Sequence, residues 1–204
     1  MSKTSDHQLE RLVFFSDAVF AIAITLLIIE VKIPHLPPGA SLAVVSQALL
    51  ASVPSIGGFI LSFLVIGRFW IGHHSALAAT AHHETKLLWP NLFLLMSIAF
   101  LPFATAFMSE NLSSTYPLIF YNASLTLTAL LSLWVIWLAT DTHNAARDVD
   151  NLQRKNLRLR GISAVMGMVL TLLISFVWQG WSQFFLFSIP LFNRLLRRIN
   201  GIKA

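Results

Sequence analysis

An acidic residue lies inside the first long apolar segment of the chain. Asp17 stands about two helical turns into the run 12–29, where the other polar residues are Ser16 and Thr25. An ionisable group in such a segment is costly to place in lipid and needs a partner or water. Arg11 precedes Asp17 by six positions, about 9 Å along a helix and about 120° around it. Because the two side chains do not share a helix face, we expect each of them to reach another helix.

The candidate partners are polar and aromatic residues of the next two apolar segments, namely Trp70, His73, His74 and Asn91. With Arg11 and Asp17 they predict a polar network that holds helices together. The alternative is that Asp17 itself binds a permeant ion.

The histidines do not form a convincing metal site. His73 is adjacent to His74, and His82 is adjacent to His83, but neighbouring side chains on a helix point about 100° apart. The chain has no cysteine, no paired carboxylates and no glycine-rich phosphate loop. We therefore predict a protein that is not an enzyme and holds neither a metal nor a cofactor. A pH-sensing role for histidine stays open, because the side chain titrates near neutrality.

The composition indicates the environment in which these residues work. Of the 204 residues, 56% are hydrophobic and only 11% are charged, against about 25% charged residues in soluble domains. The mean hydropathy is +0.71. Such a chain has too little charge to cover a water-soluble globule and too much apolar material for a disordered one, so it is expected to lie in a lipid bilayer.

The long apolar segments predict an all-α integral membrane protein with one six-span domain over residues 1–204. A span needs about 20 mainly apolar residues, and the uncharged run 161–193 is too long for one, so a break is expected at 179–182. Pro54 with Gly57 and Gly58 offers a kink in the second span. The predicted spans are residues 8–33, 41–80, 87–109, 116–140, 160–177 and 181–198.

The basic residues predict the orientation of these spans. Lys and Arg collect on the cytoplasmic side of membrane proteins. The loops 34–41, 110–116 and 179–182 carry none, whereas both ends of the chain and the loops after the second and fourth spans carry most of them. Both termini are therefore expected in the cytoplasm. The net charge of +5 is then an orientation signal, and nucleic acid is not an expected partner.

A stripe of small and apolar residues runs along the first span. Ala18, Ile22, Thr25, Leu26 and Ile29 recur at helical spacing. Such a stripe is typical of core or lipid packing, and spacing alone does not assign it to a pore. Ion pores use carbonyl rings, charged rings or apolar constrictions. No Thr-Val-Gly-Tyr-Gly filter occurs in the chain.

The start of the first span resembles a known channel signature. The string Arg11-x-x-x-Phe15-Ser16-Asp17, followed by the apolar run 18–27, is similar to that of the transmembrane protein 175 family. These are potassium-permeable channels of endosomes and lysosomes with prokaryotic relatives. The six spans, the group at 70–74, Asn91 and the sequence Leu-Pro-Phe at 101–103 extend the resemblance over the chain. Animal relatives carry two six-span repeats, whereas this chain has one.

The resemblance implies a homotetramer in which the first span of each subunit lines a central pore. The constriction would be Ile22, with Leu26 and Ile29 further out, and Thr25 would add a hydroxyl to the pore wall. The segment from Phe15 to Asp17, including Ser16, would belong to the polar network. The implied function is a potassium-preferring cation channel with monovalent cations and lipid as partners. It would be a multi-pass protein of the cell membrane, the bacterial inner membrane if the source is prokaryotic.

Two other functions compete with the channel. A proton-coupled transporter or proton leak would use Asp17 and the membrane histidines. A scaffold or enzyme subunit in the membrane would conduct no ions. We expect these alternatives to differ in whether ions flow without a coupled proton gradient.

Overall fold

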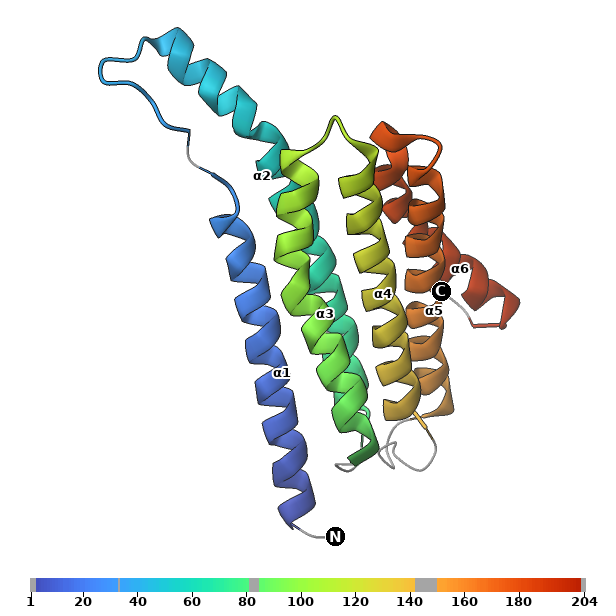
Figure 1. Ribbon diagram of the computed structural model, residues 1–204. Helices are drawn as coiled ribbons and strands as arrows, with labels where there is room; N and C mark the ends of the chain where they lie inside the picture. Colours follow the sequence, from blue (N-terminus) through green and yellow to red (C-terminus); the bar gives the residue numbers. More distant parts are fainter. Residues whose placement is uncertain (1–2, 33, 81–84, 142–149, 203–204) are drawn as a thin grey trace.

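A computed structural model describes residues 3–32, 34–80, 85–141 and 150–202 of the chain. The described part is helical throughout (Figure 1). Its elements are α1 (Lys3–Ile29), α2 (Leu42–Ala78), α3 (Thr85–Glu110), α4 (Thr115–Ala139), α5 (Asn151–Ser175), the 3-10 helix η1 (Gln179–Phe187) and α6 (Ser188–Ile199).

The helix lengths confirm an all-α membrane protein. Helices α1 to α5 are each long and apolar enough to cross a bilayer. The predicted fifth span at 160–177 begins earlier than expected, because α5 starts at Asn151. Its first turns carry charged residues, yet Leu157 and Leu159 among them are buried. The helix therefore packs and continues beyond the apolar segment that the composition marks.

The predicted last span at 181–198 is divided into η1 and α6 rather than forming one helix. Pro190 explains the division, because proline lacks an N–H group and fits an α-helix only in its first turn. With 12 residues, α6 extends about 18 Å and does not cross a hydrocarbon core of about 30 Å by itself. Gln183 of η1 donates a hydrogen bond to Asn122 Oδ1 of α4 at 3.0 Å, which holds this segment against the bundle.

Helices α3, α4 and α5 stand side by side in the bundle, with α1 at one flank and α6 at the other (Figure 1). The first turns of α2 lean away from the other helices. No residue of α2 before Gly58 is buried. Helix α2 contains Pro54, which removes one backbone hydrogen bond at the point where the helix leaves the bundle.

Small side chains and hydroxyl groups bring α2, α3 and α4 close together. At Gly58 an added Cβ would lie 3.0 Å from Cβ of Ser109, so a larger residue would require Ser109 to shift. Next to it, Thr105 donates to Ser62 Oγ at 2.8 Å, and Ser62 bonds the buried Tyr121 hydroxyl at 2.9 Å. Helix association in lipid depends on such close packing and interhelical hydrogen bonds, so these contacts fix the bundle against which α1 packs.

Candidate functional site

Helix α1 packs on the bundle through one stripe of side chains. Leu12, Ser16, Phe20, Ala23 and Leu27 are all buried. Their spacing of three and four residues places them on one face of an α-helix. Helices α2 and α3 are the two elements that α1 contacts. One face of α1 is therefore fixed against its own bundle.

The opposite face of α1 carries the residues predicted to line a pore. Ile22 is 57% exposed and Ile29 is 71% exposed, and Thr25 between them is also exposed. Leu26 lies at the edge of this face and is 41% exposed. The structure thus brings the predicted residues onto one outward surface that the chain itself leaves uncovered. Their role at a constriction stays a prediction, because it depends on contact between copies of the chain.

The Thr25 side chain is oriented by its own helix. Its hydroxyl lies 3.0 Å from the carbonyl oxygen of Ala21 and 2.9 Å from that of Ile22. A hydroxyl has one hydrogen to donate and two lone pairs that accept. Because the hydrogen points back to the helix backbone, the outward side of the oxygen offers lone pairs, which suit a cation rather than an anion.

A buried polar network joins α1, α2 and α3 at the middle of α1. Ser16, His73 and Asn91 are each about 1% exposed or less. The amide nitrogen of Asn91 donates to Ser16 Oγ at 3.0 Å, and Ser16 donates to the Leu12 carbonyl at 2.8 Å. The Asn91 amide oxygen lies 2.7 Å from His73 Nε2. Since an amide oxygen only accepts, His73 carries its hydrogen on Nε2 in this arrangement.

A second contact between α1 and α2 lies beside this network and is more open. Trp70 donates from Nε1 to Asp17 Oδ1 at 2.8 Å. The Trp70 ring lies 5.7 Å from the His74 ring, centroid to centroid. Asp17 therefore finds its partner on the next helix, as the sequence predicted for an acid inside an apolar segment.

The structure does not join every predicted member to the network. His74 contacts Trp70 through its ring, and Phe15 is exposed. Arg11 is exposed too, and it makes no hydrogen bond or ion pair with the described part of the chain. It lies five residues before Ser16 and hence about 140° around the helix from the buried stripe. The place of Arg11 in the network stays a prediction.

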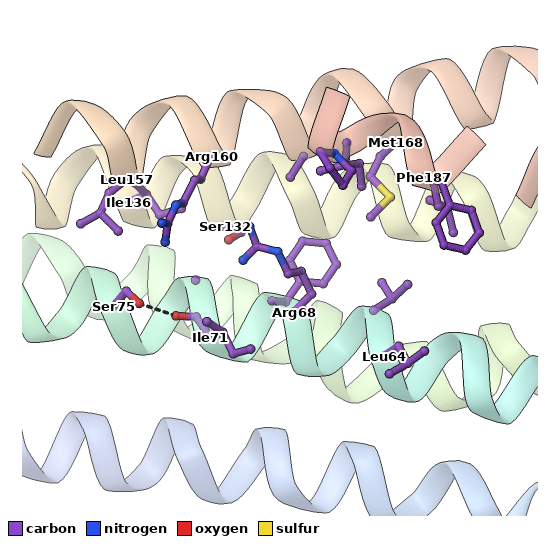
Figure 2. Close-up of a pocket in the computed structure, with 18 of the residues that line it drawn as sticks. Leu64, Arg68, Ile71, Ser75, Ser132, Ile136, Leu157, Arg160, Met168 and Phe187 are labelled. Atoms are coloured by element: carbon purple, nitrogen blue, oxygen red, sulfur yellow. Dashed lines mark hydrogen bonds between the residues drawn. The ribbon is translucent and has the colours of Figure 1, made fainter. Parts of the chain in front are cut away.

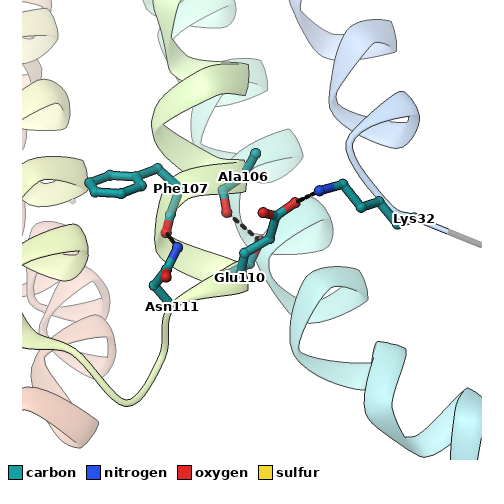
Figure 3. A network of polar contacts seen from close by, with 6 residues as sticks. Lys32, Ala106, Phe107, Glu110 and Asn111 are labelled. Atoms are coloured by element: carbon teal, nitrogen blue, oxygen red, sulfur yellow. Dashed lines mark hydrogen bonds and ion pairs between the residues drawn. The ribbon is translucent and has the colours of Figure 1, made fainter. Parts of the chain in front are cut away.

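An ion pair just beyond the C-terminal end of α1 was not predicted from the sequence. Lys32 Nζ lies 2.6 Å from Glu110 Oε1 at the end of α3 (Figure 3). The hydrogen bond and the charge of Glu110 raise the pKa of Lys32 above its ordinary value. Asn111 donates to the Phe107 carbonyl at 2.9 Å and so caps α3 beside the pair. The sequence signal that could have predicted this pair is the presence of opposite charges, Lys32 and Glu110, at the ends of two spans.

No group of three or more His, Asp or Glu side chains is arranged to hold a metal within residues 3–32, 34–80, 85–141 and 150–202. His82 and His83, which the sequence suggested as a weak metal signal, lie outside the described residues.

Known proteins resemble the chain over most of its length. The family model "Endosomal/lysosomal potassium channel TMEM175" matches residues 11–102. A potassium channel of Streptomyces collinus is 35% identical over 178 residues, which is 82% of each protein. A potassium channel of Chamaesiphon minutus is 40% identical over 102 residues, half of each protein.

Solved structures show the same fold. The crystal structure of a lysosomal potassium-selective channel TMEM175 homolog from Chamaesiphon minutus has a TM-score of 0.79 and 26% identity, and covers 93% of this chain and 97% of that one. The matched relatives are potassium channels, a non-enzymatic class, which confirms that the chain is not an enzyme. From the sequence matches and the shared fold it follows that the chain belongs to the TMEM175 family of potassium channels.

Proposed function

We propose that this chain is a potassium-preferring cation channel, formed by four copies with α1 of each copy lining a central pore. The observation that carries the proposal is the outward face of α1. That face presents Ile22, Thr25 and Ile29 away from the bundle, while the opposite face is buried. A helix arranged in this way supplies one side of a shared surface, and the family supplies the expectation that the surface is a pore.

The chemistry of this face suits a hydrophobic constriction. A ring of Ile22 side chains offers no oxygen to replace the water around an ion, and apolar constrictions gate by excluding water. Potassium holds its water less tightly than sodium, so a cation preference for potassium is the expected result. The outward lone pairs of Thr25, one turn away, add an acceptor for a partly dehydrated cation.

The buried network has a structural role in this proposal. Ser16, His73 and Asn91 fix the middle of α1 against α2 and α3, and so they set the direction in which Ile22 points. Potassium ions, lipid and further copies of the chain are the partners. In this proposal the multi-pass protein lies in the cell membrane with both termini in the cytoplasm, and in the inner membrane if the source is a bacterium.

The test is a pair of matched substitutions on α1. Ile22→Asn places a polar group on the proposed pore face, whereas Ile28→Asn places the same group elsewhere on the helix at a similar exposure of 51%. In liposomes with a potassium gradient and no coupling ion, Ile22→Asn should increase potassium flux and lower the preference over sodium. Ile28→Asn should leave both unchanged. Equal effects of the two substitutions would refute a pore lined by this face.

The alternative function is proton transport through Asp17 and the membrane histidines. The groups concerned lie together at the middle of α1 and do not extend along it, since the buried stripe beyond them continues with Phe20, Ala23 and Leu27. This arrangement supports a contact that holds the helices together more than a proton path across the bundle. Asp17→Asn keeps an oxygen for the Trp70 hydrogen bond, so the fold should survive. Loss of a flux driven by a proton gradient in that variant would favour the alternative.

A further inference from the structure

A side pocket lies between α2, the α4–α5 pair and the C-terminal helices, away from α1. Its volume is about 240 Å³. The lining is mainly apolar, with Leu64 of α2, Ile136 of α4, Met168 of α5 and Phe187 of η1. Leu64 and Phe187 are mostly exposed, so the pocket opens sideways rather than being enclosed in the bundle.

Two arginines interrupt this apolar lining. Arg68 of α2 and Arg160 of α5 both line the pocket. Figure 2 shows them reaching from opposite walls into the same space, with Leu64, Met168 and Phe187 beyond them at one end. The pocket therefore has a cationic part and an apolar part, which is the division found in an amphiphilic ligand.

The two arginines stand where two long uncharged segments end. The segment 41–67 has no charged residue, and Arg68 follows it directly. The segment 161–193 also has none, and Arg160 precedes it directly. From these positions within α2 and α5, the long arginine stem lets each guanidinium extend toward the lipid headgroups while its methylene groups stay among apolar side chains.

Neither guanidinium has a partner within the described part of the chain. The described ion pairs involve other residues, and no hydrogen bond joins Arg68 or Arg160 to a described residue. Arg158, two positions before Arg160, does have partners in the protein. It donates to Thr140 Oγ1 and to the Thr140 carbonyl, both at 2.9 Å, and lies 4.2 Å from the centre of the Trp137 ring. Arg158 therefore stabilises the fold, whereas Arg68 and Arg160 are available to a ligand in the pocket.

We infer that this pocket binds an anionic phospholipid, with its phosphate on Arg68 and Arg160 and an acyl chain along Leu64, Met168 and Phe187. Guanidinium groups bind phosphate oxygens through paired, charge-assisted hydrogen bonds. Basic pockets between membrane helices are suited to anionic headgroups. The ligand satisfies two cations at the ends of long uncharged segments that the described chain leaves without a counter-charge.

The test uses native mass spectrometry of the whole delipidated protein with added lipids of matched chains. Wild-type protein should retain phosphatidylglycerol about tenfold better than phosphatidylcholine. R68Q/R160Q should lose this preference. The control K86Q/R194Q removes two exposed positive charges outside the pocket and should keep it. Ala164→Phe narrows the pocket while both arginines are kept, and it should weaken retention of phosphatidylglycerol.

Several outcomes would overturn the inference. No headgroup preference in wild-type protein would do so, as would an equal loss in the control variant. Water-soluble glycerol phosphate bound as well as the lipid would show an anion site without a place for a chain. If R68Q/R160Q changed the number of subunits and left lipid preference intact, the pocket would be a contact between copies of the chain. The wild-type lipid series and Ala164→Phe decide the matter if R68Q/R160Q fails to fold.

Discussion

The middle and the C-terminal end of α1 are held by different physical means. At the middle of the helix, Ser16 shares a buried network with Asn91 and His73, in which direction and distance are fixed. Beyond the end of the helix at Ile29, Lys32 pairs with Glu110 in a contact where Lys32 is largely exposed. Buried hydrogen bonds demand one geometry, whereas exposed ion pairs tolerate several and are weakened by salt. The comparison indicates a helix that is fixed at its middle and adjustable at its C-terminal end.

Breaking the buried network should have the largest effect. Asn91→Leu leaves the His73 N–H group without its acceptor and Ser16 without its donor. We expect a loss of about 1–2 kcal/mol, the range for interhelical hydrogen bonds of this kind, seen as a lower melting temperature of the purified protein. Ser97→Ala on the same helix removes a hydroxyl that bonds only its own backbone and should change little. Equal stability of the two variants would contradict a holding role for the network.

The Asp17–Trp70 contact should give an intermediate effect. Trp70→Phe removes the donor and keeps most of the ring, and we expect a loss of about 0.5–1.5 kcal/mol. Asp17→Asn keeps an acceptor oxygen and should cost less. A double-mutant cycle with Asp17→Ala measures the contact itself, because Trp70→Phe should then have a smaller effect than in wild-type protein. Additive effects of the two substitutions would mean that the bond contributes nothing to stability.

The Lys32–Glu110 pair should give the smallest effect and a salt dependence of its own. Lys32→Gln and Glu110→Gln should each lower stability slightly at low salt. The difference from wild-type protein should vanish near about 1 M salt, where the screening length is about 3 Å. Asn91→Leu should remain destabilising under the same conditions. A salt-independent loss in Lys32→Gln would assign the effect to packing rather than charge.

The same pair predicts a pH dependence at the alkaline end. The pKa of Lys32 is raised above 10.5 in the folded protein, so the folded state holds this proton more tightly than the unfolded chain does. The contribution is therefore complete below pH 10.5 and is lost as the pH rises through the raised value. Melting temperatures of wild-type protein and Lys32→Gln should converge above that pH and stay apart at neutral pH. Convergence already at neutral pH would contradict the pairing.

The sequence was informative wherever a residue conflicted with its surroundings. Asp17 and Asn91 stand in apolar segments, where a polar group needs a partner, so their meeting with Trp70 and His73 could be anticipated without coordinates. The exposed face of α1 followed from helical spacing, although spacing did not assign it to a pore. The family signature at 11–17 added that expectation.

Other features depend on distances that spacing along one segment does not encode. Lys32 and Glu110 belong to different spans, and only the packing of α1 on α3 brings them together. The division of the last predicted span at Ser188 reflects the local effect of Pro190. Arg160 counted as an orientation signal in the sequence and Arg68 as an interruption of the second apolar segment, and the packing of α2 near α5 brings the two to one pocket.

Pro54 of α2 has a mechanical consequence for the Lys32–Glu110 contact. Because Pro54 has no amide hydrogen, the carbonyl of Leu50 lacks its usual helical donor. The turns before it have no buried residue and are linked through residues 34–41 to the Lys32 end of α1. A force on these first turns of α2 is therefore expected to reach the end of α1 that the salt-sensitive Lys32–Glu110 pair holds. The first turns would then move together, with the helix bending at Pro54.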